Sequence, residues 1–306
     1  HREGSNLERV KKIFSYYTQN AAELFEQIQW ITADLNDIPA LEEAFVGIDQ
    51  VYHSAAFISF DPKDHGTLQK INTEGTANII NLCLAKKVQK LCYVSTIGAI
   101  GKSLDGSPAS EENDWIEQDA NVYALSKYDA EMEVWRGAQE GLPTVIINPG
   151  VILGPGFWGS GSGEFFTTAN KGYSYYPPGG TGFVSVTDVT EVMIQLTNSD
   201  VVSERYILVA QNLSFQKILT LISENLGKKG PRKELKHWQL QTGRFFDYLA
   251  NLITGKGRRI TKNSIKSLYQ RDDYTSDKIK KTLDFEFEAI EPIVKFCCER
   301  FKEENP

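Results

Sequence analysis

The 306-residue sequence lacks long apolar runs, an excess of basic residues and cysteines at metal-ligand spacing. No apolar run approaches the ~18 residues of a membrane-spanning helix. A net charge of −7 argues against a nucleic-acid surface, which would be basic on at least one face. The four cysteines, Cys83, Cys92, Cys297 and Cys298, indicate buried, reduced thiols. These absences predict a cytoplasmic protein that uses no membrane, nucleic acid or metal.

Short runs of apolar and β-branched residues alternate with helix-like stretches in the first two thirds of the chain. The strand-like runs lie at 28–34, 50–56, 90–96 and 144–150, and the helix-like stretches at 38–46, 66–87 and 121–140. This alternation predicts a doubly wound parallel α/β sheet with helices on both faces. From residue 151 glycine, proline and aromatic residues become frequent. After a further strand-like run at 205–211 come helix-like stretches at 214–227, 238–253 and 275–282. This change predicts a smaller, mixed C-terminal lobe that closes over one edge of the sheet.

Small and polar residues follow each strand-like run. Ligands of open parallel sheets bind outside the carboxyl ends of the strands. We therefore expect the residues at these ends to line one crevice. They are Asp34, Ser54, Ala55, Ala56, Ser95, Thr96, Pro149 and Gly150.

Tyr123 and Lys127 lie four residues apart on the expected helix 121–140, so they share one face of it. A tyrosine with a pKa near 10 is a poor acid or base at neutral pH unless a nearby cation stabilises its phenolate. Thr96 ends a neighbouring strand and offers a hydroxyl that can hold a substrate oxygen while the tyrosine exchanges its proton. A second Tyr-x-x-x-Lys, Tyr274 to Lys278, has no strand ending in Ser or Thr before it and is expected on the surface.

Seven motifs occur in one order along the chain: ITADL, VYHSAA, INTEGTANIINLC, LCYVSTIGAIG, YALSK, INPGVILGPG and GFVSVTDV. In this order and spacing the chain resembles the extended short-chain dehydrogenase/reductases over roughly residues 1–190. The resemblance implies a Rossmann-type dinucleotide-binding domain over 1–150, to which 182–212 return. It implies a substrate lobe made of 151–181 and 213–306.

The resemblance also implies catalytic roles. Tyr123 would be the general acid/base, Lys127 would bind the nicotinamide ribose and lower the tyrosine pKa, and Thr96 would hold the substrate oxygen. Asn72 matches a helix asparagine whose role is structural or catalytic. The lysine could also be a solvated helix residue, and the threonine an ordinary strand residue.

Cofactor contacts follow from the same resemblance. Asp34 with Leu35 would lie at the adenine, although Asp34 could merely cap the next helix. Ala55 and Ala56 would lie against the cofactor, or be small for tight packing. The other expected cofactor contacts are Ser54, Ser95, Tyr123, Lys127, Pro149, Gly150 and Val151. Arg2 would pair with an adenosine 2′-phosphate, which favours NADP over NAD; the alternative is a solvated terminal residue.

One feature departs from the family. No glycine-rich phosphate loop occurs in residues 1–30, and the literal G-x-G-x-x-G at 154–159 lacks the helix onset that would aim amides at a pyrophosphate. We expect that some 25–30 residues of strand, glycine loop and helix precede residue 1, the length of a βαβ start.

The substrate remains open between two classes. The marks of sugar-nucleotide epimerases and dehydratases, an Arg before Pro149 and an Asn-x-Tyr-Gly after it, are absent. Aromatic lobe residues, among them Phe157, Trp158 and Tyr175, favour an apolar or ring-bearing carbonyl substrate. The alternatives are a sugar-nucleotide substrate and a catalytically silent NAD(P)-sensing protein. The resemblance further suggests a homodimer formed by the helices at 66–87 and 121–140.

Overall fold

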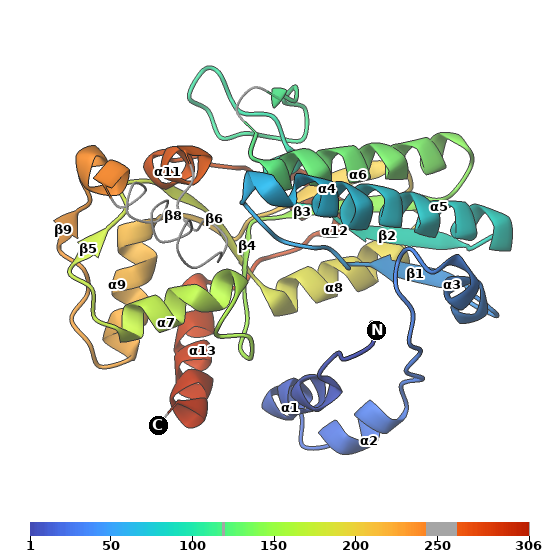
Figure 1. Cartoon of the computed structure of the whole chain (residues 1–306), viewed down its shortest axis with the longest axis horizontal. Helices are drawn as coiled ribbons and strands as arrows, with labels where there is room; N and C mark the ends of the chain where they lie inside the picture. The colour runs from blue at the N-terminus through green and yellow to red at the C-terminus, as the bar shows by residue number, and fades with distance from the viewer. Residues whose placement is uncertain (118–119, 243–261, 306) are drawn as a thin grey trace.

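Four parallel strands form the main sheet of the computed structural model, which describes residues 1–117, 120–242 and 262–305. Their order is β1 (Gln50–His53), β2 (Lys90–Val94), β3 (Thr144–Pro149), β7 (Glu204–Leu208). Every neighbouring pair runs parallel. The strands are joined through helices, so the predicted α/β alternation is confirmed (Figure 1).

Helices cover both faces of this sheet. One face packs against α3 (Ile38–Ala44), α5 (Gly75–Lys86) and α6 (Val122–Gln139). The other face packs against α8 (Val186–Thr197) and α12 (Asp277–Leu283). Successive strand side chains point to opposite faces, so Tyr93 of β2 lies in the α5–α6 core and Cys92 lies in the α8 core. This two-sided burial explains why β2 and β3 read as nearly continuous apolar runs.

The helices that carry the site have distinct ends. α6 begins at Val122, where the Asn121 side chain accepts from the backbone N–H of Ala124. α5 continues a helical segment formed by α4 (His65–Leu68) and a π-helical turn, Gln69–Glu74. It ends at Lys86, and the left-handed backbone of the next residue, Lys87, closes the last turn.

A mixed lobe follows β3. A small sheet of β4 (Val151–Leu153), β6 (Gly180–Ser185) and β8 (Gln211–Ser214) packs against three helices. These are α7 (Glu164–Asn170), α9 (Phe215–Asn225) and α13 (Ile290–Glu304). A short pair, β5 (Tyr175–Tyr176) and β9 (Lys233–Glu234), and helix α11 (Lys262–Tyr269) lie at its far end (Figure 1).

The division between sheet domain and lobe differs in detail from the predicted boundaries. The segment that contains α12 lies within the predicted lobe range 213–306. Its Ile279 is fully buried in the core formed by β2, β3, β7 and α8. This part of the C-terminal sequence therefore returns to the main sheet.

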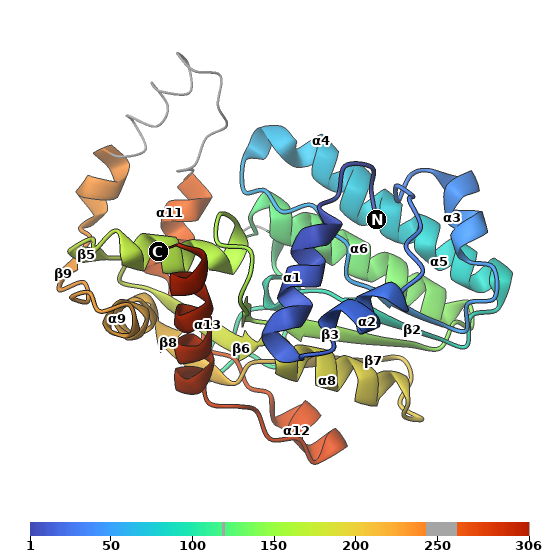
Figure 2. The same cartoon turned by 90° about the horizontal axis from the view of Figure 1, so that it is seen from below.

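The N-terminal residues form α1 (Leu7–Tyr17) and α2 (Ala21–Glu26). α1 lies beside α13 of the lobe, where Arg9 and Lys12 reach the Glu304 carboxylate at 3.6 and 3.5 Å (Figure 2). The strand predicted at 28–34 is wrong, because this stretch has no strand conformation. A strand requires a partner along its length. This stretch makes two backbone hydrogen bonds to a neighbouring segment, one at Ile31 and one at Ala33, and both are with His1.

The second Tyr-x-x-x-Lys is also placed differently from the prediction. Tyr274 is buried in a cluster with Ile97, Ile207 and Val209, so its expected surface position is wrong. The sequence offered no partner strand for it, yet its backbone pairs with the Asn212 side chain. Most of the helix predicted at 238–253 lies outside the described residues.

Three predictions concern the cysteines, membrane-spanning helices and metal ligands. The four cysteines are buried and free, as expected. Among the described residues no helix combines the length and apolarity needed to cross a membrane. Within the same part of the chain, no group of three or more His, Cys, Asp or Glu side chains is arranged to hold a metal ion.

Candidate active site

Thr96 and the Tyr123–Lys127 pair come from adjacent elements, β2 and α6. Thr96 follows β2 and caps a short 3₁₀ turn, where its Oγ1 accepts from the Gly98 N–H at 3.2 Å. The hydroxyl hydrogen of Thr96 is therefore free to donate to a substrate oxygen. Tyr123 lies in the first turn of α6 and Lys127 in the second. The three residues thus lie where the carboxyl end of β2 meets the start of α6.

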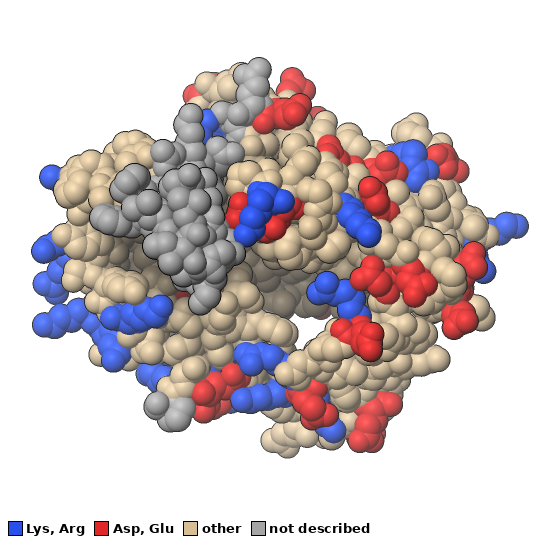
Figure 3. Space-filling view, in the orientation of Figure 1, with Lys and Arg blue, Asp and Glu red and all other residues tan. Residues whose placement is uncertain are grey.

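Figure 3 shows a recess in the middle of the molecule, between the lobe and the sheet. The carboxyl ends of the main strands point toward the lobe (Figure 1). The recess is therefore at the position where open parallel sheets bind ligands.

Lys127 is an almost completely buried cation, with 1% of its surface exposed. Its Nζ donates to the Tyr93 hydroxyl at 2.5 Å and to the Val94 carbonyl oxygen at 2.9 Å. Burial lowers the pKa of Lys127 to about 7, and the nearby Glu131 carboxylate acts in the opposite direction. A proton can therefore be taken up or released at this ammonium near neutral pH.

Tyr123 is half-buried, and its ring meets Phe60 edge-on at 5.7 Å. Burial raises the pKa of Tyr123 to about 12. This direction is opposite to the lowering that the resemblance implies for the enzyme with its cofactor. With this pKa the phenol is protonated at neutral pH, the form that a general acid requires.

Asn72 has a clear structural task. It is 1% exposed in the π-helical turn, its Oδ1 accepts from the Phe57 N–H at 2.7 Å, and its Nδ2 donates to the Phe57 carbonyl and to Ser126 Oγ, both at 3.0 Å. These bonds tie the loop after β1 to the start of α6. Of its two predicted roles, this geometry supports the structural one.

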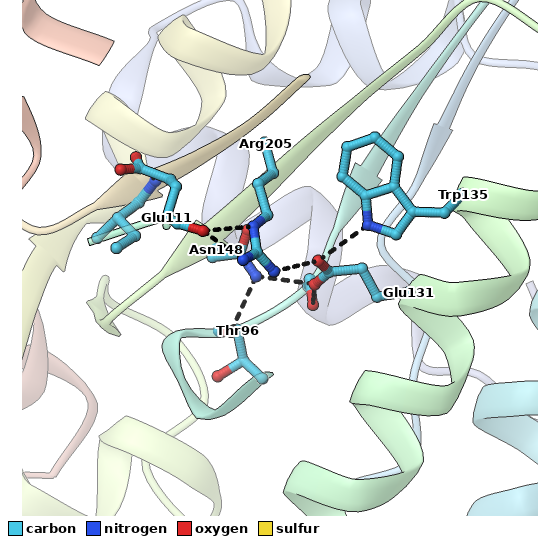
Figure 4. A network of polar contacts seen from close by, with 8 residues as sticks. Thr96, Glu111, Glu131, Trp135, Asn148 and Arg205 are labelled. Atoms are coloured by element: carbon cyan, nitrogen blue, oxygen red, sulfur yellow. Dashed lines mark hydrogen bonds and ion pairs between the residues drawn. The ribbon is translucent and has the colours of Figure 1, made fainter. Parts of the chain in front are cut away.

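The sequence prediction missed a buried polar cluster around Glu131 (Figure 4). Glu131, one turn after Lys127 on α6, is fully buried. Its Oε2 accepts from Ser95 Oγ at 2.6 Å and Asn148 Nδ2 at 2.9 Å, and its Oε1 from Arg205 Nη1 at 3.3 Å. Trp135 donates to Oε1 at 3.4 Å. The spacing of four residues from Lys127 was the available signal, because it places Glu131 on the same helical face.

Ser95 and Leu35 have internal partners. The hydroxyl of Ser95 is engaged by Glu131, so its predicted cofactor contact would need another atom or a rearranged bond. Leu35 packs against Gly75, and its carbonyl accepts from Asn78 Nδ2 at 2.9 Å, which anchors the turn after residue 34 on α5.

Asp34 is exposed and accepts from the Asn36 backbone and side-chain amides at 3.0 and 3.3 Å. The cap of α3 is Asp37, so the alternative role of Asp34 as that cap is not the one observed. Its exposed carboxylate is available to a ligand hydroxyl.

The remaining predicted cofactor residues are small or exposed. Ser54, Ala55 and Ala56 follow β1 with exposed side chains. Gly150 lies between β3 and β4, where a Cβ would overlap the Gly182 carbonyl oxygen. The neighbours of Gly150, Pro149 and Val151, end β3 and begin β4, and Arg2 is exposed near the N-terminal end of the chain.

The three predicted substrate residues differ in their environments. Trp158 lies in the lobe core between Phe166 and Phe301, and its indole N–H donates to the Glu304 carboxylate at 3.0 Å, which argues against a substrate contact. Phe157 is 54% exposed beneath the Arg9 guanidinium. Tyr175 is 42% exposed on β5.

A separate hollow of about 410 Å³ lies between α1 and α13. Tyr17, Gly154, Pro155 and Phe296 are among its lining residues, and Thr96, Tyr123 and Lys127 are not. It includes the first residues of the literal G-x-G-x-x-G, but Gly154 and Pro155 follow a strand and precede no helix onset. The chemistry described above therefore does not belong to this hollow.

The residues present fit a nicotinamide dinucleotide. Among the described residues, the Lys127 ammonium has acceptors for two of its three N–H donors, which leaves one donor for a ribose hydroxyl. The exposed small residues after β1 allow a ring system to lie against the backbone.

Comparisons with known proteins identify the family of the chain. The model of an NAD-binding family described as male sterility protein matches residues 1–205. The chain is 29% identical over 269 residues to a putative dihydroflavonol 4-reductase of Synechocystis sp., covering 84% of this chain and 76% of that protein. It is 32% identical over 138 residues to cinnamoyl-CoA reductase 1 of Petunia hybrida, covering 42% of this chain and only 40% of the relative.

A solved structure shows the same fold. The UDP-glucose 4-epimerase of Thermus thermophilus, in complex with NAD, superposes with a TM-score of 0.70 at 19% identity over 90% of this chain and 85% of that one. The predicted Rossmann-type architecture is thereby confirmed. Because the family model matches residues 1–205, a range that includes the strand ends and the Tyr-x-x-x-Lys helix, the chain belongs to the NAD-binding male sterility protein family, within the extended short-chain dehydrogenase/reductases.

Proposed function

We propose that the protein reduces a ketone, or oxidises the matching secondary alcohol, by hydride transfer with a nicotinamide cofactor. The observation that carries this proposal is the meeting of Thr96, Tyr123 and Lys127 at the carboxyl end of β2. Relatives named as dihydroflavonol and cinnamoyl-CoA reductases support a carbonyl substrate.

The cofactor supplies the hydride when it is bound. Thr96 then donates its hydroxyl hydrogen to the carbonyl oxygen and holds it close to Tyr123. The protonated phenol of Tyr123 transfers its proton to that oxygen as negative charge develops there. Lys127 holds the cofactor ribose, and its positive charge favours the resulting phenolate.

The test is Tyr123→Phe, which removes the transferable proton and keeps the ring against Phe60. NAD(P)H affinity should be unchanged, and turnover of ketones, followed by nicotinamide absorbance, should fall by about 10²–10⁴. Lys127→Met should weaken both cofactor affinity and turnover. Tyr128→Phe is the matched control: this half-buried tyrosine on the same helix stacks on Trp115. Near-normal turnover of Tyr123→Phe would refute the proposal.

The same assay separates the other two functions. Conversion of a sugar nucleotide without net redox change would identify an epimerase or dehydratase. Cofactor binding with no turnover of any ketone or sugar nucleotide would identify a sensing protein.

Preference for NADP is part of the proposal. Arg2 is exposed, so its guanidinium is available to pair with an adenosine 2′-phosphate. Dissociation constants for the two cofactors, measured for the wild type and Arg2→Ala, test this idea. Equal affinities, or tighter binding of NAD, would end it.

A homodimer through α5 and α6 is also proposed, on the resemblance alone. Light scattering at micromolar concentration should give twice the monomer mass. A monomer mass would contradict it.

A further inference from the structure

Glu131 is a fully buried carboxylate whose acceptor positions face polar groups of three strands and its own helix. Burying a charge is costly unless it is paired and hydrogen-bonded. The Arg205 guanidinium, at 3.3 Å, supplies the pairing on Oε1. The second oxygen, Oε2, is directed instead toward Ser95 and Asn148 at the ends of β2 and β3 (Figure 4).

The bonds on Oε2 lead directly to the reacting residues. Asn148 Nδ2 donates both to Glu131 Oε2, at 2.9 Å, and to the Thr96 carbonyl oxygen, at 3.1 Å. Ser95, the residue before Thr96, donates to the same carboxylate oxygen at 2.6 Å. The backbone that presents the Thr96 hydroxyl is therefore held against α6, the helix that carries Tyr123.

We propose that Glu131 is a positioning residue for the carbonyl reduction: it holds Thr96 in register with Tyr123 through Asn148 and Ser95, and it keeps Lys127 charged from one helical turn away. This inference rests on the proposed function. A carboxylate needed only to pair Arg205 would have no reason to bind the ends of two active-site strands with its other oxygen.

The second half of the proposal depends on what surrounds the Lys127 ammonium. Tyr93 of β2 bonds it, His53 of β1 lies beyond the Tyr93 ring at 5.5 Å between centroids, and Tyr123 and Glu131 flank it on α6. Burial depresses the pKa of Lys127, and Glu131 is the group that raises it. Without the carboxylate, the ammonium would lose its proton at a lower pH.

The principal test is Glu131→Gln, which keeps the size of the side chain and removes its charge. Both oxygens of Glu131 accept from donors, so the amide nitrogen of the glutamine faces a donor whichever way the amide is turned. The hydrogen bonds on that side are therefore lost. We expect kcat to fall by roughly 10²-fold, the loss that follows from misplacing a reacting group by about 1 Å. We expect NADPH affinity to fall as pH rises through the pKa of Lys127, and this decline should begin at a lower pH in the variant. Fluorescence titration of NADPH measures the decline and needs no substrate.

Two further variants separate the two effects. Asn148→Ala cuts the link to Thr96 and leaves the charge, so kcat should fall while the pH dependence of NADPH affinity stays as in the wild type. Glu133→Gln is the matched control, since Glu133 is a partly exposed glutamate on α6 that pairs with Arg136. It should change neither quantity.

The outcomes decide the proposal in every case. A folded Glu131→Gln protein with wild-type kcat and an unmoved pH dependence overturns it. If that variant does not fold, Asn148→Ala decides alone, and wild-type kcat in Asn148→Ala overturns it. If the wild type reduces no ketone, the proposed function fails, while NADPH titration still reports whether Glu131 sets the charge of Lys127.

Discussion

Acid should destabilise this protein through His53, a buried histidine beside the active site. His53 lies on β1 with 4% of its surface exposed, and its Nε2 is 2.9 Å from the Thr76 hydroxyl oxygen. Burial, and then the positive charge of Lys127, lower the pKa of His53 from 6.5 to about 3. Between these two values the unfolded chain binds a proton that the folded protein does not, so stability falls as pH falls through this window.

The magnitude follows from the pKa difference. At pH 4, unfolded His53 is 2.5 units below its pKa of 6.5, while the folded imidazole is still mostly neutral. At 1.36 kcal/mol per unit, the free energy of unfolding should fall by about 3 kcal/mol relative to neutral pH. This is a large share of a total stability of about 5–15 kcal/mol.

Urea unfolding at pH 7 and pH 4 measures this loss, and His53→Gln isolates it. The glutamine amide can occupy the position of Nε2 beside Thr76 but does not titrate. The variant should therefore lose about 3 kcal/mol less than the wild type between the two pH values, a difference of about 1–3 M in the urea midpoint. His65→Gln, at an exposed histidine of α4, is the control and should behave as the wild type. Equal losses in the wild type and His53→Gln would refute the reasoning.

Three packing predictions follow from the same structure. Gly150→Ala should destabilise the fold by about 1–3 kcal/mol, because its Cβ would overlap the Gly182 carbonyl; an unchanged thermal midpoint would contradict this. Trp158→Phe should lower stability by about 1–3 kcal/mol, because the hydrogen bond to Glu304 is lost, and KM should stay unchanged. A raised KM would instead indicate that Trp158 contacts the substrate. A Cβ on Gly137 would lie 2.6 Å from Ile80 Cγ2 between α5 and α6, so Gly137→Ala should be destabilising. The double variant with Ile80→Ala should then be less destabilised than the two single effects added together, and simple additivity would argue against the contact.

The sequence by itself determined the class of fold and the three residues proposed for catalysis. Strand-like runs alternate with helical stretches, and such an order has few packed solutions. Thr96 and Tyr123 could be placed together from the sequence, because each follows from where a strand ends or a helix begins. These are local properties of the chain, carried by neighbouring residues.

The failures have one physical cause, which is that strand formation and burial are properties of partners. The stretch 28–34 has the composition of a strand, but composition does not supply a neighbouring strand. Tyr274 follows a run of charged residues, yet its side chain is covered by Ile97, Ile207 and Val209 from distant parts of the chain. Trp158 likewise lies in a core completed by α13, more than a hundred residues later.

Tertiary structure alone decided the electrostatics of the site. The pKa of Lys127 depends on how completely β2 and α6 exclude water, and that of His53 on the same packing. Glu131 is an ordinary helix glutamate in the sequence; only folding brings Ser95, Asn148 and Arg205 from three strands to its two oxygens. Local spacing can place a charge on a helix face, but its partners and its solvent exposure arise only when distant segments close around it.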